Sequence, residues 1–235
     1  TGNGHEIVDS EEEADAIVIN TCCFIHDAKE ESVNTILEMA EYKKTGTCKI
    51  LIVTGCMAQR YKEEITEEIP EVDAVLGTTS YGDIVKALNE AEAGHVFQEF
   101  KDINALPEDS GRRVITTGGH FGYLKIAEGC DKHCTYCIIP SLRGKFRSVP
   151  EERLLKQAEY MASQGVRELI LVAQETTVYG TDLYGKKTLH ILLKKLCQIK
   201  GIRWIRVLYC YPEEIYDELI LVMKEEKKIC HYLDL

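Results

Sequence analysis

The 235-residue sequence lacks several features that would place it in a specialised class of protein. Its longest apolar runs, Ile50-Leu51-Ile52-Val53 and Leu169-Ile170-Leu171-Val172-Ala173, are far shorter than the roughly 20 residues of a membrane-spanning helix. With 45% apolar and 29% charged residues, the composition excludes disorder and collagen-like repeats. The ten cysteines are about 4% of the 235 residues, below the roughly 8–10% cysteine that marks disulfide-stapled secreted domains. We therefore expect a soluble protein of one large or two ordinary domains in a reducing cytoplasm.

Basic residues are scarce in the first half of the chain. Residues 1–110 hold 8 basic and 24 acidic side chains, whereas residues 111–235 hold 20 basic and 15 acidic ones. An acidic half repels a nucleic-acid backbone and suits a basic partner better, but for the charge excess taken alone a solvated surface is favoured over a docking face.

The first hundred residues alternate apolar strands with amphipathic helices. Residues 15–20 and 49–54 are β-branched runs typical of strands buried on both faces of a parallel sheet. Helical spacing of apolar residues predicts helices over 30–42, 58–69 and 81–93. Residues 1–100 are therefore predicted to form an α/β domain, an open doubly wound parallel sheet. The opening Thr-Gly-Asn-Gly suggests a fragment whose first strand lies upstream.

The periodicity fades over residues 101–120, which we interpret as a linker. Residues 121–235 then resume the alternation and are predicted to form the front half of a (β/α) partial barrel, for which about 250 residues is typical when complete. We expect strands near 122–127, 167–173, 203–209 and 230–235, and helices near 150–164, 188–199 and 212–228.

The most informative motif is Cys130-Asp131-Lys132-His133-Cys134-Thr135-Tyr136-Cys137. It follows the first predicted strand of the second domain, where parallel barrels place their active sites. A structural zinc site wants a fourth ligand, for which His133 is a candidate. A [4Fe–4S] cluster on three cysteines instead leaves one iron open for chemistry. A second pair, Cys22 and Cys56, follows the two strands of the first domain and is expected at the same sheet edge.

The CxxxCxxC motif at the first strand of a βα repeat resembles the radical S-adenosylmethionine superfamily. Nearly the whole chain resembles its methylthiotransferase family. The matching segments are Gly4-His5-Glu6-Ile7-Val8, Asn20-Thr21-Cys22, Thr54-Gly55-Cys56-Met57-Ala58-Gln59-Arg60, Tyr123-Leu124-Lys125-Ile126-Ala127-Glu128-Gly129-Cys130, and Ile139-Pro140 through Arg143-Gly144.

The resemblance implies two [4Fe–4S] clusters and S-adenosylmethionine as cofactors. Cys130, Cys134 and Cys137 would hold the cluster that cleaves S-adenosylmethionine to a 5′-deoxyadenosyl radical. Cys22 and Cys56 match two of three ligands of the second cluster, which carries the methylthio sulfur. The third ligand is expected upstream of Thr1, with Cys23 a conceivable stand-in ranked behind Cys22.

Within the family, the segments 172–185 and 208–215 are similar to the RimO branch, which modifies the β-carbon of an aspartate in ribosomal protein S twelve. The resemblance then implies a small-subunit ribosomal protein as substrate and a reduced flavodoxin- or ferredoxin-type electron donor. A transfer-RNA adenosine methylthiotransferase is the alternative, and a non-catalytic iron–sulfur or zinc module is the third reading.

Three further residues are candidate cofactor contacts. Tyr136 could lie along the adenine or simply shield the cluster, and Gln174 stands at a strand's carboxyl end. Arg143 could neutralise a cluster or the cofactor carboxylate. Tyr209 and Tyr211 are expected on one strand face, near substrate or in the core. Four cysteines are interpreted as structural: Cys48, Cys197, Cys210 and Cys230.

Overall fold

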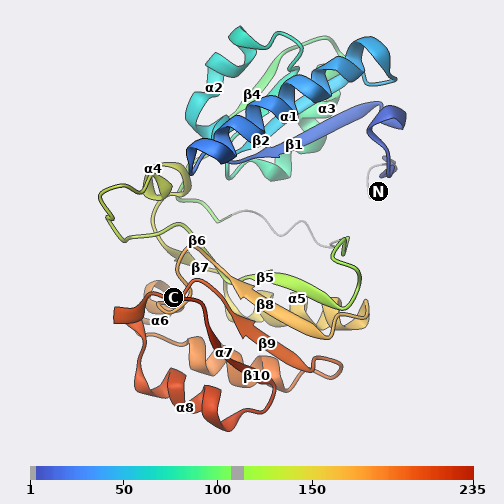
Figure 1. The fold of residues 1–235 in the computed structure, drawn as a ribbon. Helices are drawn as coiled ribbons and strands as arrows, with labels where there is room; N and C mark the ends of the chain where they lie inside the picture. Colours follow the sequence, from blue (N-terminus) through green and yellow to red (C-terminus); the bar gives the residue numbers. More distant parts are fainter. Residues whose placement is uncertain (1–3, 107–113) are drawn as a thin grey trace. The chain divides into compact units, whose positions relative to one another are not determined.

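The computed structural model describes residues 4–106 and 114–235 (Figure 1). The chain forms two compact units. The first comprises Thr1–Asp109 and Cys134–Arg143, and the second comprises Ser110–His133 and Gly144–Leu235. The middle of the expected linker, residues 107–113, lies outside the described residues. Among the helices of the described ranges, none is both long and apolar enough to cross a membrane.

The first unit contains a parallel four-stranded sheet with the order β1-β2-β3-β4. Its strands are β1 (Ala16–Thr21), β2 (Ile50–Gly55), β3 (Ala74–Leu76) and β4 (Phe97–Glu99). The helices are α1 (His26–Thr45), α2 (Cys56–Glu68) and α3 (Ile84–Glu92). Helices α1 and α2 pack on one face of the sheet and α3 packs on the other. The predicted open α/β arrangement is confirmed.

The two strands predicted from β-branched runs differ in burial. Every residue of β2 is buried, as expected for a strand covered on both faces. In β1 burial alternates, and Val18 is 42% exposed. The prediction that residues 15–20 are buried on both faces was therefore wrong. β1 is the terminal strand of the described sheet, and its alternating burial shows that one of its faces is covered and the other is open.

The second unit contains another parallel sheet, in which chain order and spatial order coincide. Its strands are β5 (Phe121–Lys125), β8 (Glu168–Val172), β9 (Trp204–Val207) and β10 (Ile229–Leu233), paired in that sequence. The helices α5 (Glu151–Ser163), α7 (Leu189–Cys197) and α8 (Asp217–Glu225) contribute to one core. A sheet that grows in one direction, with its helices in one layer, is a sector of a barrel.

Two predicted elements of the second unit are interrupted. The segment 122–127 divides into β5 and the short β6 (Ala127–Glu128). The helix expected over 212–228 divides into a 3₁₀ turn, Pro212–Glu214, and α8. Between these two, Tyr216 is extended, and its hydroxyl accepts a hydrogen bond from the backbone N–H of His190 at 3.3 Å. Tyr216 thus contacts α7 in an extended conformation rather than continuing a helix. The spacing of apolar residues along 212–228 gives no sign of this contact.

Gly55 is the last residue of β2 and lies opposite Thr21, the last residue of β1. Its backbone conformation leads to a prediction about stability. Its φ is +99°, and a Cβ there would lie 2.4 Å from the carbonyl oxygen of Thr21. Gly55→Ala should therefore lower the free energy of unfolding by more than about 2 kcal/mol, measured by denaturant unfolding. Gly94→Ala is the matched control, since φ is +79° but no atom lies within 4 Å. Equal losses in the two variants would contradict the steric argument.

The structural cysteines generate a second prediction. Burial raises the pKa of Cys197 to about 11 and also raises the pKa values of Cys48 and Cys210. At pH 8 the thiolate fraction of Cys197 is then about 100-fold below that of a thiol with the ordinary value of 9.0. Mass spectrometry after iodoacetamide treatment should show these three unlabelled while the partly exposed Cys230 reacts. All four should react in denaturant, and equal native rates would refute their burial.

Candidate functional site

The loop that carries the cysteine motif has a closed neck. β6 pairs antiparallel with β7 (Arg147–Ser148), so the chain leaves and returns at one place. Gly129 has a φ of +75°, and a Cβ there would lie 2.2 Å from the carbonyl oxygen of Lys145. Only glycine permits this approach. The neck thereby holds the residue immediately before Cys130.

Hydrogen bonds continue from the neck into the motif. The backbone N–H of Cys130 donates to the carbonyl oxygen of Gly144 at 3.2 Å. The carboxylate of Asp131 accepts a hydrogen bond from the backbone N–H of Phe146 at 3.0 Å. The backbone N–H of Lys132 points at the sulfur of Cys130 at 3.4 Å. The first cysteine of the motif is thus held by its own loop.

The far part of the loop packs differently. Residues 134–143, which include α4 (Ile139–Arg143), belong to the first unit. Leu142 is buried in the core of that unit, and its carbonyl oxygen accepts a hydrogen bond from the hydroxyl of Thr78 at 2.8 Å. Cys130 therefore belongs to the second unit, whereas Cys134 and Cys137 belong to the first.

The chemistry of the donor set fits an iron–sulfur cluster. None of the ten cysteines, all of which lie in the described ranges, forms a disulfide, and Cys130, Cys134 and Cys137 are partly exposed. Thiolates are the ligands that such clusters use. Within the described ranges no group of three Cys, His, Asp or Glu side chains is assembled as a metal site. His133, the candidate fourth zinc ligand, is likewise part of no such group there.

The second predicted pair lies at neighbouring strand ends. Thr21 pairs with Gly55 across β1 and β2, so Cys22 and Cys56 each follow one of two adjacent strands. Cys22 is exposed, and its backbone N–H donates to the hydroxyl of Ser32 at 3.0 Å. Cys56 is the first residue of α2. The prediction that both cysteines follow strands at one sheet edge is confirmed by this register.

Two neighbours of Cys56 bear on its chemistry. The guanidinium Nε of Arg143 donates to the sulfur of Cys56 at 3.2 Å, so this cation faces the first-unit pair. Cys23 is buried, and burial, followed by the nearby Cys56 thiol, raises its pKa. Arg143 therefore places a positive charge next to a sulfur that is a candidate metal ligand.

The remaining candidates have different environments. Tyr136 is 84% exposed. Gln174 follows β8, and its side-chain oxygen is buried without a hydrogen-bond partner among the described residues. Such an atom is suited to a bound polar ligand. Tyr209 and Tyr211 do not share a strand face as predicted, because β9 ends at Val207 and Tyr209 has a φ of +59°.

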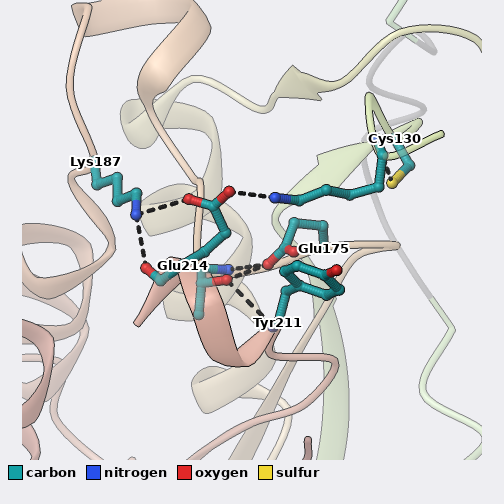
Figure 2. Close-up of polar contacts among 7 residues, drawn as sticks. Cys130, Glu175, Lys187, Tyr211 and Glu214 are labelled. Carbon is teal, nitrogen blue, oxygen red and sulfur yellow. Dashed lines mark hydrogen bonds and ion pairs between the residues drawn. The ribbon is translucent and has the colours of Figure 1, made fainter. Parts of the chain in front are cut away.

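A charged cluster beside Cys130 escaped the sequence analysis (Figure 2). The carboxylate of Glu214 pairs with the ammonium groups of both Lys132 and Lys187. Hydrogen bonds from these two lysines lower the pKa of Glu214. Burial opposes charge on Lys132, but Glu214 outweighs it and raises the pKa of that lysine. Residues 82 positions apart carry no sequence signal of such a pairing.

The cluster borders a cavity of about 290 Å³ within the second unit. Glu175, which is buried, lines it together with Cys130. One oxygen of Glu175 accepts a hydrogen bond from the backbone N–H of Thr177 at 2.9 Å. The cavity thus combines one cysteine of the motif with fixed charges of both signs, an arrangement suited to a polar, charged ligand.

Comparison with known proteins assigns both parts of the chain. Residues 124–235 match the model described as "Radical SAM superfamily", and residues 1–77 match "Uncharacterized protein family UPF0004". A solved radical S-adenosylmethionine methyltransferase, TsrM from Kitasatospora setae, superposes with a TM-score of 0.59 at 10% identity. The superposition covers 91% of this chain and 46% of TsrM. At that identity the likeness concerns the fold alone.

Sequence relatives are much closer. The chain is 66% identical over 232 residues to the ribosomal protein uS12 methylthiotransferase RimO of Lachnoclostridium phytofermentans, covering 99% of this chain and 53% of that protein. It is 51% identical to the protein of the same name from Clostridioides difficile, with coverage of 99% and 52%. The chain spans about half the length of these curated relatives. Over that shared length, the chain is similar to proteins named RimO methylthiotransferase, and its second part matches the radical SAM superfamily.

Proposed function

We propose that the protein to which this chain belongs is a cytoplasmic radical S-adenosylmethionine methylthiotransferase that modifies an aspartate of ribosomal protein uS12. The observation that carries the proposal is the closed-neck loop, which places Cys130 after the first strand of a barrel-type sheet and continues along the chain to Cys134 and Cys137. The relatives named RimO support the same substrate. The reaction adds a methylthio group to the aspartate β-carbon.

The three motif cysteines are proposed to hold one [4Fe–4S] cluster. When bound, this group supplies the electron that breaks a carbon–sulfur bond of S-adenosylmethionine. The chain's own part is positional, because Gly129 and the hydrogen bond to Gly144 hold Cys130 in place. The cavity beside Cys130 is the proposed place for the cofactor. Gln174 and Tyr136 are the proposed polar and aromatic contacts.

Cys22 and Cys56 are proposed as ligands of a second [4Fe–4S] cluster. Their positions after paired strands support this role, as does the Arg143 guanidinium beside Cys56. Arg143 is therefore proposed to act at this second cluster by donating a hydrogen bond to the Cys56 sulfur. Cys23 is buried beside Cys56, so it is the reserve candidate for the third position.

A ribosomal protein is favoured over transfer RNA as the substrate. Residues 1–110 carry a large acidic excess, which repels a phosphate backbone and attracts a basic protein. The electron donor is proposed to be a small flavodoxin- or ferredoxin-type protein. Transfer-RNA adenosine modification is the alternative that the second experiment below addresses.

The first test removes one motif cysteine. After anaerobic reconstitution with iron and sulfide, Cys134→Ala should lose about four irons per chain relative to the parent, because a three-thiolate cluster has no spare ligand. It should also form no 5′-deoxyadenosine from S-adenosylmethionine and reductant. Cys230→Ala is the control, since Cys230 lies in β10 outside both sets. A zinc-loaded parent, or unchanged product in Cys134→Ala, would overturn the assignment.

The second test identifies the substrate with the complete protein. Mass spectrometry of ribosomal proteins from a deletion strain should show uS12 without its methylthio group, restored by the gene. Nucleosides from digested transfer RNA of the same strain should be unchanged. Loss of a methylthiolated adenosine with intact uS12 modification would favour the alternative, and no change in either would favour a non-catalytic module.

A further inference from the structure

We propose that Glu214 is a positioning residue for the cluster loop, clamping the Cys130 end through the ammonium group of Lys132. The inference rests on the proposed function for its purpose but not for its geometry. Glu214 lies in the 3₁₀ turn after β9, and Lys132 lies two residues after Cys130 (Figure 2). The clamp therefore joins the motif loop to a different strand–helix connection of the second unit.

Glu214 is itself held on more than one side. Its second carboxylate oxygen pairs with Lys187 at 2.8 Å, and its backbone carbonyl accepts a hydrogen bond from the same ammonium at 2.7 Å. Lys187 thus fixes both the side chain and the backbone of Glu214. The Glu214 carboxylate thus lies between two ammonium groups, and each of its oxygens pairs with one of them. Glu214 is consequently a fixed anchor for Lys132.

The ammonium group of Lys132 has a second contact besides Glu214. This group lies 4.4 Å from the ring centroid of Tyr211, a cation–π contact on the same turn as Glu214. The backbone N–H of Tyr211 in turn points at the hydroxyl of Thr177 at 3.4 Å. The exposed fractions of the Lys132 and Glu214 side chains are 28% and 26%, so solvent screens this pair only partly. Ring and carboxylate together define one position for the lysine.

The clamp complements the neck of the loop. Cys130 and Asp131 are tied to Gly144 and Phe146, which lie just before β7 in the returning part of the same loop. Lys132 is tied to the turn after β9 instead. Its backbone N–H also points at the sulfur of Cys130, a contact that depends on the local turn. Hydrogen bonds to cluster sulfurs influence cluster properties, so a fixed Lys132 fixes this one too.

Hydrogen–deuterium exchange of the metal-free chain tests the clamp directly. Glu214→Gln should exchange severalfold faster in the peptide spanning residues 129–133, while distant peptides are unchanged. Lys132→Met should have the same effect although it changes the charge in the opposite direction, and Lys132→Arg should restore protection. Glu213→Gln removes the same charge from an exposed neighbour in the turn and serves as the control.

Exchange in Glu214→Gln equal to that in Glu213→Gln would overturn the clamp. If Glu214→Gln unfolds, the two Lys132 variants test the clamp instead. Equal exchange of residues 129–133 in Lys132→Met and Lys132→Arg would then overturn it. In the reconstituted chain, the electron paramagnetic resonance signal of the reduced cluster should broaden in Glu214→Gln and Lys132→Met alone, and an unchanged signal would refute the effect on the cluster. A parent that assembles no cluster would refute the proposed function, whereas the exchange result would still decide the clamp.

Discussion

The site depends on the close approach of two backbone segments at the neck of the cysteine loop. At Gly129 the chain adopts a left-handed conformation and passes so near Lys145 that no side chain fits. This approach permits the two-residue antiparallel pairing of β6 with β7 and the hydrogen bond from Cys130 to Gly144. Without it, the motif would be a long unconstrained loop whose ordering carries a large entropic cost.

Residues of this loop belong to both units of the chain. Its beginning is tied to the second unit by backbone hydrogen bonds and by the Lys132–Glu214 pair. Its middle places Leu142 in the core of the first unit, and Arg143 reaches the sulfur of Cys56. One short segment of chain therefore carries three motif cysteines and also contributes a cation to the other cysteine pair.

Much of this organisation is predictable from the sequence where the signal is local. The β-branched run at 49–54 predicts the central strand β2, and the helical spacing at 150–164 predicts α5, because burial on two faces or on one stripe selects different residues. The cysteine spacing and its place after a strand predict the motif loop. The β-branched run at 15–20 led to a wrong prediction of burial on both faces. The same composition also occurs in β1, a terminal strand in which Val18 is exposed.

What the sequence by itself determined are the local elements and the donor chemistry: parallel strands, amphipathic helices and thiols at strand ends. Only the tertiary structure decided that Tyr216 interrupts a helix to meet His190, and that Glu214 faces Lys132 and Lys187. Neither contact leaves a periodic or compositional trace, because each joins residues from separate βα units. Strand order decides which βα units are neighbours in space. Contacts between such units therefore depend on strand order rather than on residues that are adjacent in the sequence.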